Sequence, residues 1–173
     1  MAAAQAAAIE YRSTLVHEPT HLSGYSMGHA SSFGGLLGVV RPPLSPRELP
    51  ALWNAGSGIE VLSWPADKSG FILDELVEDT FLIQENGGTG LGGPVVYDRR
   101  TNIREEVTLP SIQDSSFEVV ASLDQNRFVG YMVTQFADYF YEWQKTNGEW
   151  SYRRVDGFNG RPLGYSNDGL LYG

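Results

Sequence analysis

One plan occurs three times in the chain, in Ala51-Leu-Trp-Asn-Ala-Gly-Ser-Gly-Ile-Glu-Val-Leu-Ser-Trp-Pro65, Val95-Val-Tyr-Asp-Arg-Arg-Thr-Asn-Ile-Arg-Glu-Glu-Val-Thr-Leu-Pro110 and Tyr139-Phe-Tyr-Glu-Trp-Gln-Lys-Thr-Asn-Gly-Glu-Trp-Ser-Tyr-Arg-Arg-Val-Asp-Gly157. Each stretch has an apolar and aromatic run, a turn containing Gly or Asn, and a second run. The aromatic residues Trp53, Tyr97 and Tyr141 are 44 and 44 residues apart. Such regular spacing indicates an internal repeat.

A second pair of strand-like runs belongs to each unit. Phe71 and Phe117 are 46 residues apart, and Phe81 and Phe128 are 47 apart. Val, Ile and aromatic residues favour strands, and turns such as Asn147-Gly148 supply the positive φ angles of two-residue hairpins. The sequence therefore predicts an all-β protein with about four short strands per unit, which is typical of a small β-propeller of about four blades. A β-sandwich or barrel with regular hairpins is the alternative.

The segment 71–81 is the least clear part of this pattern. Ile72, Leu73, Leu76 and Val77 would share one helical face, whereas an alternating strand would place Glu75 and Asp79 on the buried face. The repeat alignment favours a strand, which is our prediction.

The two ends carry fragments of the same plan. Residues 161–173 are similar to the first half of a further unit, and residues 9–16 to the last strand of one. We expect a tail over residues 1–8 and a single β-repeat domain over residues 9–173. An N-terminal strand that completes a C-terminal partial unit would leave no exposed strand edge.

The clearest repeat residues, Arg127-Phe-Val-Gly-Tyr-Met132, Tyr139-Phe-Tyr-Glu-Trp143, Asn147-Gly-Glu-Trp150 and Val95-Val-Tyr-Asp-Arg-Arg-Thr-Asn102, resemble HAF-type and kelch-like propeller repeats. The resemblance covers residues 51–173 and consists mostly of turn and aromatic positions. It implies a binding or scaffolding repeat and no particular reaction.

Composition excludes several classes of function. The chain has 173 residues, 42% of them hydrophobic and 19% charged, which is a globular balance. It has no Cys, so disulfides, thiol catalysis and thiolate metal sites are excluded. The net charge of −9 disfavours nucleic acid and anionic membranes as partners.

Targeting signals are not evident in the sequence. No apolar run approaches the roughly 20 residues of a membrane span. The first nine residues lack the basic start and apolar core of a secretory signal. We expect a soluble protein with no signal peptide in this chain, and the compartment is left open.

The sharpest local motif is His17-Glu-Pro-Thr-His21, which has the letters of H-E-x-x-H. In zinc peptidases the two histidines bind the metal and the Glu, here Glu18, is the general base. His29 would be a third ligand, two residues later than the metzincin spacing requires. Pro19 argues against the helix that this chemistry needs, because it removes a backbone donor and clashes with the preceding turn. A zinc hydrolase or a non-catalytic metal site is therefore an alternative to a polar loop.

Aromatic residues give the candidate ligand contacts. Trp53, Trp143, Trp150 and Tyr152 could stack on sugars or anchor a protein partner, although their regular recurrence favours core packing. We expect a non-enzymatic β-repeat module that needs no cofactor and recognises a protein or glycan partner, or assembles with copies of itself. The alternatives are a zinc-dependent hydrolase and an acidic inhibitor or immunity-type protein whose negative face meets a basic partner.

Overall fold

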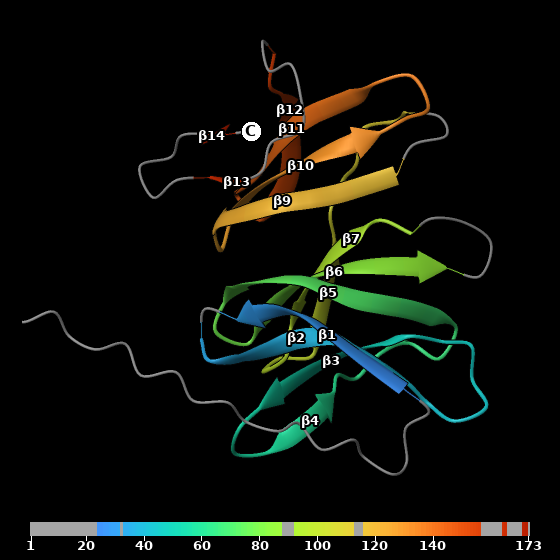
Figure 1. Ribbon diagram of the computed structural model, residues 1–173. Coiled ribbons are helices and arrows are strands. Elements are labelled where there is room, and N and C mark those ends of the chain that lie inside the picture. Colours follow the sequence, from blue (N-terminus) through green and yellow to red (C-terminus); the bar gives the residue numbers. More distant parts are fainter. Residues whose placement is uncertain are drawn as a thin grey trace, which may run out of the picture.

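Three four-stranded antiparallel sheets follow one another along the chain in the computed structural model (Figure 1). The structure describes residues 24–31, 33–87, 92–112, 116–156, 164–165 and 171–172. In each sheet the strands pair in chain order, and the described residues contain no helix, so the all-β prediction is confirmed. Sheet 1 contains β1 (Gly24–Ser31), β2 (Gly35–Arg41), β3 (Leu49–Asn54) and β4 (Gly58–Val61); sheet 2 contains β5 (Lys68–Val77), β6 (Thr80–Gly87), β7 (Pro94–Asp98) and β8 (Ile103–Glu106); sheet 3 contains β9 (Ser116–Asp124), β10 (Arg127–Val133), β11 (Asp138–Thr146) and β12 (Glu149–Arg154).

A fourth, two-stranded sheet pairs β13 (Gly164–Tyr165) with β14 (Leu171–Tyr172), and β13 contacts β9. None of the described sheets closes into a barrel. The prediction of a single domain over residues 9–173 remains a prediction, and the predicted tail over residues 1–8 lies outside the described residues.

A β-bulge recurs at the same place in the first strand of all three sheets. The unpaired residue is Gly28 in β1, Leu73 in β5 and Val120 in β9. A bulge inserts one extra residue and increases the local twist of the strand. Because an irregularity recurs as well as the strands, the three sheets are copies of one structural unit. The bulges face equivalent steps of the second strands: Leu37 to Gly38, Leu82 to Ile83 and Val129 to Gly130.

The aromatic residues that revealed the repeat lie in the third strands. Trp53 of β3 pairs with Leu36, and Tyr97 of β7 pairs with Phe81, at equivalent ladder positions. In sheet 3 that position belongs to Trp143, which pairs with Phe128, so the Tyr141 equivalence is corrected by two residues. The β11–β12 hairpin continues to a two-residue turn at Asn147-Gly148, where both φ angles are positive. Side chains alternate with period two, so Tyr141 and Trp143 still share a face.

The segment 71–81 forms the end of β5, a turn at residues 78–79 and the start of β6, which confirms the strand prediction. Strict alternation would bury Glu75 and Asp79, but Leu73 and Leu76 are both unpaired in the β5–β6 ladder and interrupt the alternation. Glu75 is half-buried, and Asp79 lies in the turn with a φ of 66°.

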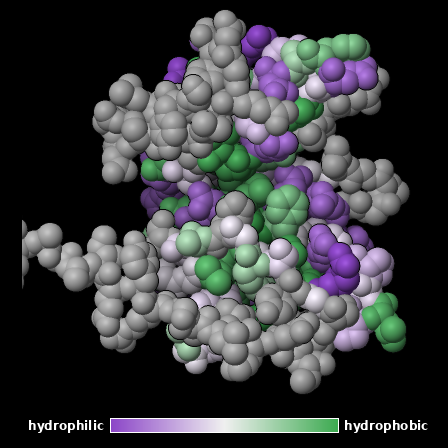
Figure 2. Space-filling view, in the orientation of Figure 1, coloured by the Kyte–Doolittle hydropathy of each residue, from purple (hydrophilic) through white to green (hydrophobic). Residues whose placement is uncertain are grey.

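The sheets pack face to face through separate apolar clusters. Leu37 and Leu52 of sheet 1 pack with Phe81 and Tyr97 of sheet 2. The other face of sheet 2 packs on sheet 3, and Figure 2 shows hydrophobic side chains in the band where these two sheets meet. Sheet 2 therefore presents one face to sheet 1 and the opposite face to sheet 3.

Candidate functional site

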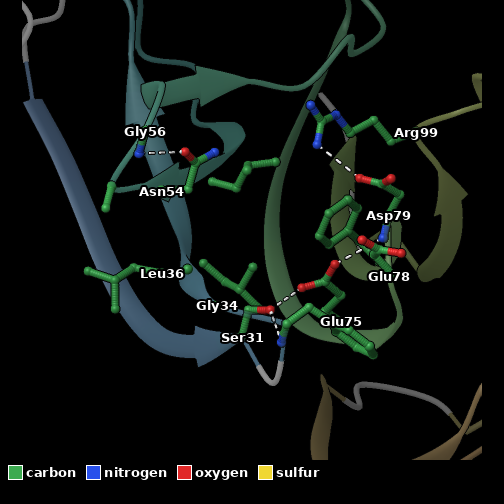
Figure 3. A pocket seen from close by; sticks show the side chains of 15 residues that line it. Ser31, Gly34, Leu36, Asn54, Gly56, Glu75, Glu78, Asp79 and Arg99 are labelled. Carbon is green, nitrogen blue, oxygen red and sulfur yellow. Dashed lines mark hydrogen bonds and ion pairs between the residues drawn. The ribbon is translucent and has the colours of Figure 1, made fainter.

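A cavity of about 470 Å³ lies between sheets 1 and 2, at the end where their hairpin turns meet (Figure 3). This volume is in the range of small-ligand sites, roughly 300–1,000 Å³. The lining residues come from four turns and from the strands that enter them: Ser31, Phe33, Gly34, Gly35, Leu36, Leu37, Leu52, Asn54, Ala55, Gly56, Glu75, Glu78, Asp79, Phe81 and Arg99.

The apolar part of the lining continues the core between the two sheets. Leu37, Leu52 and Phe81 are 1%, 8% and 2% exposed, so they form a closed floor. Phe33, in the turn between β1 and β2, is 51% exposed. An exposed ring beside a cavity offers a flat apolar surface on which a ligand can stack.

Glu75 joins the two sheets across the cavity. Its carboxylate accepts a hydrogen bond from the Ser31 hydroxyl of sheet 1, a contact drawn in Figure 3. The other oxygen, Oε1, accepts from the backbone N–H of Asp79 at 3.0 Å. The Ser31 Oγ also accepts from the backbone N–H of Phe33 at 2.9 Å, which fixes the turn that carries the exposed ring.

An ion-pair network forms the rim on the side of sheet 2. Asp79 Oδ1 lies 2.9 Å from Arg99 Nη1, and Asp79 Oδ2 lies 2.7 Å from Arg100 Nε. Arg99 also reaches Glu60 of sheet 1 at 2.8 Å, and Arg100 reaches Glu78 at 2.9 Å. The hydrogen bond from Arg100 to Asp79, and then that to Glu78, raises the pKa of the Arg100 guanidinium.

The β7–β8 turn holds both arginines in place. Asp98 Oδ1 accepts from the backbone N–H groups of Arg100 at 2.8 Å and Thr101 at 3.1 Å. The hydrogen bond from Thr101 is the main cause of the lowered pKa of Asp98. Asn102 adopts a φ of 56° and accepts a hydrogen bond from the Tyr97 hydroxyl at 2.9 Å.

The chemistry of the cavity follows from these contacts. Three carboxylates, those of Glu75, Glu78 and Asp79, line the cavity against one guanidinium group, that of Arg99, so an anionic ligand is disfavoured. Carboxylates accept hydrogen bonds and guanidinium groups donate them, while the floor and Phe33 are apolar. A ligand with hydroxyl or amide groups and an apolar face would match this lining.

The predicted metal-binding residues are largely outside the described part of the chain. His17, Glu18 and His21 lie there, so the zinc hydrolase and metal-site alternatives stay untested. His29 lies in β1 next to the bulge, where its backbone pairs with Leu37. The described residues contain no group of three or more His, Cys, Asp or Glu that could hold a metal ion.

The predicted aromatic residues do not form one surface. Trp143 is 0% exposed and its indole Nε1 donates to Thr108 O at 3.0 Å, and Trp150 is 7% exposed. The folded protein offers no free face of Trp143 for stacking. Trp53 is partly exposed in β3, and Tyr152 is 40% exposed in β12. Burial of the two sheet-3 tryptophans agrees with the core-packing interpretation of the repeat.

The sequence analysis did not select Phe33, Glu75 or Arg99. Only the tertiary packing brings the acidic residues of the β5–β6 hairpin to sheet 1. The available signal was the recurrence of the hairpin turns in each repeat unit, since turns at equivalent positions of neighbouring sheets lie at the same end.

Comparison of the chain with protein-family models, with curated proteins and with solved structures finds no match. No described residue belongs to a helix that is long and apolar enough to cross a membrane.

Proposed function

We propose that the protein is a non-enzymatic β-repeat module that recognises a protein or glycan partner through the cavity between sheets 1 and 2. The observation that carries this proposal is a cavity of ligand size with an apolar floor, an exposed Phe33 ring and a rim of fixed hydrogen-bonding groups.

The state of the carboxylates favours binding over catalysis. A hydrolytic pair needs one carboxyl to give a proton and another to accept one or attack. Both oxygens of Asp79 are engaged by arginines, and both oxygens of Glu75 accept hydrogen bonds from within the protein. These groups are held as fixed recognition elements.

We also propose that the sheets are blades of a small propeller of about four blades. The support is the recurrence of four strands in chain order, of the bulge in each first strand and of the contacts between successive first strands β1, β5, β9 and β13. Hairpin turns then gather at one end of the ring, where repeat proteins of this kind bind partners.

The test uses a printed array of neutral and acidic glycans and a displayed library of random 12-residue peptides, screened with the full chain. The strongest probe is then measured by calorimetry against Phe33→Ala, whose loss of a stacking ring should weaken binding about tenfold. Phe136→Ala is the matched control, because Phe136 is 88% exposed in the β10–β11 connection and lies outside the cavity lining. Equal binding by both variants, or no probe above background, would contradict the proposal.

A further inference from the structure

The residue at the ladder position of Trp53 is exposed to a different extent in each of the three sheets. The equivalent residues Tyr97 and Trp143 are 4% and 0% exposed, whereas Trp53 remains partly exposed. All three are large aromatic residues on third strands. The difference therefore comes from what covers each sheet.

In sheets 2 and 3 the cover is the preceding sheet. Tyr97 packs with Leu37 and Leu52 of sheet 1. Trp143 packs in the same way with Leu82 and Val96 of sheet 2. An aromatic residue at this position is thus an interface residue wherever a sheet precedes it.

We name the corresponding surface of sheet 1 the Trp53 face; it consists of Leu36, Trp53, Ile59 and Val61. These side chains are half-buried or, for Val61, 37% exposed. In Figure 3 Leu36 lies on the far side of β2 from Glu75, so this face is separate from the interface with sheet 2. Farther along the same side, Val40 and Ala51 are 0% exposed, which shows that this side of the sheet is not simply a solvent face.

The fourth sheet has the right sequence to cover the Trp53 face. β13 begins 48 residues after β9, and β14 begins 44 residues after β10, which continues the spacing of the repeat. Leu171-Tyr172-Gly173 repeats Phe128-Val129-Gly130 and Leu36-Leu37-Gly38. This alignment places Tyr172 at the position of Leu37, which packs against the following sheet.

We propose that the fourth sheet, begun by β13 and β14, docks on the Trp53 face and so closes the ring between sheet 3 and sheet 1. Trp53 is then a ring-closing interface residue and not a ligand contact. The basis is continuity: the same face buries the same kind of residue at the two interfaces already formed. This inference rests on the blade arrangement proposed above, and the Trp53 face shares only Leu36 with the lining of the ligand cavity.

The experiment uses the absence of Cys from the chain. The full chain carrying Ile59→Cys and Tyr172→Cys is treated with a short bis-maleimide and analysed by denaturing gel and mass spectrometry. Two cysteines that the fold brings together have an effective concentration of about 1 mM, so at about 10 μM protein the intramolecular product should exceed the intermolecular one by about 100-fold. The matched control carries Ile103→Cys with Tyr172→Cys, because Ile103 is 60% exposed at the start of β8 in sheet 2.

Crosslinked monomer in the Ile59 pair, and not in the Ile103 pair, supports the proposal. Covalent dimer as the main product would assign the Trp53 face to a second copy, and no crosslink in either form would leave the face uncovered; both results overturn the proposal. Circular dichroism checks that each variant folds. If Tyr172→Cys unfolds the chain, the single variant Ile59→Cys tests the cover alone: its thiol should react at least tenfold more slowly than that of Ile103→Cys, at every protein concentration. Equal rates would overturn the proposal, and the glycan and peptide screens are unaffected by either outcome.

Discussion

Gly130 offers a quantitative test of how closely β9 approaches β10. A Cβ built at Gly130 would meet the Glu118 carbonyl oxygen of β9 well inside 3.0 Å and the Phe117 ring at 3.2 Å. The first obstacle is backbone of a paired strand, which cannot rotate away as a side chain can. Gly130→Ala must therefore push β9 and β10 apart where the bulge interrupts the ladder.

The magnitude follows from two opposing terms. Overpacking of a well-packed core costs about 1–3 kcal/mol, and a clash with backbone belongs at the upper end of that range. Replacing Gly by Ala in a strand returns roughly 0.5–1 kcal/mol of conformational entropy. The net loss should be about 2 kcal/mol, which for a chain of this length lowers the Tm by about 4–8 °C.

Urea unfolding followed by tryptophan fluorescence measures this loss. The matched control is Gly28→Ala, because Gly28 is the bulge residue of β1 and a Cβ there meets no atom within 4 Å. It should be neutral or slightly stabilising. Sheet 2 holds Ile83 at the position of Gly130, so the restriction comes from the closer approach of the first strand in sheet 3 and not from the bulge as such. A Gly130→Ala protein as stable as the wild type would refute this account of the ladder.

Three further predictions concern charged and titratable groups. Glu85 is 4% exposed and paired with Lys68 at 2.5 Å and Arg104 at 2.6 Å. Glu85→Gln should lower the free energy of unfolding in urea by about 2–3 kcal/mol, which is below the full cost of breaking a buried pair because both cations reach solvent. An unchanged free energy would show that the carboxylate is already solvated. Burial raises the pKa of Tyr97, so the contribution of this residue to stability is complete below pH 10 and is lost as the pH rises through the folded pKa. Tyr97→Phe should therefore flatten the decline of the Tm at alkaline pH. An unchanged decline would contradict this assignment to Tyr97. Burial raises the pKa of Asp124, but the Arg127 side chain and backbone N–H groups outweigh it and lower the pKa overall. Its contribution is therefore present above the ordinary value near 3.8 and is lost as the pH falls through the lower folded pKa. A carboxyl titration by NMR should place Asp124 below that value, and an ordinary pKa would mean that the Arg127 contact does not persist in solution.

Strand identity and the repeat could be predicted because both are local properties. Alternating apolar residues, Asn-Gly turns and a spacing near 45 residues are visible without any tertiary contact. They correctly placed Phe71 and Phe117 in the first strands of sheets 2 and 3, and they correctly matched Phe81 with Phe128 in the second strands. The bulges could not be predicted, because the unpaired residues share no residue type: they are Gly28, Leu73 and Val120. Without the bulges, strict alternation through β5 would have buried Glu75. The two-residue error at Tyr141 has another cause, because the connection before β9 (107–115) is longer than the equivalent connection before β5 (62–67).

The cavity was decided only by tertiary structure. Ser31 and Glu75 are 44 residues apart, and Arg99 reaches Glu60 across 39 residues of chain. No local pattern marks such pairs, because their contact depends on how one sheet is placed on the next. The sequence by itself determined which residues form strands, since that choice depends on near neighbours. Which side chains share a cavity depended on how whole sheets pack on one another, because that packing brings together turns that are far apart in the chain.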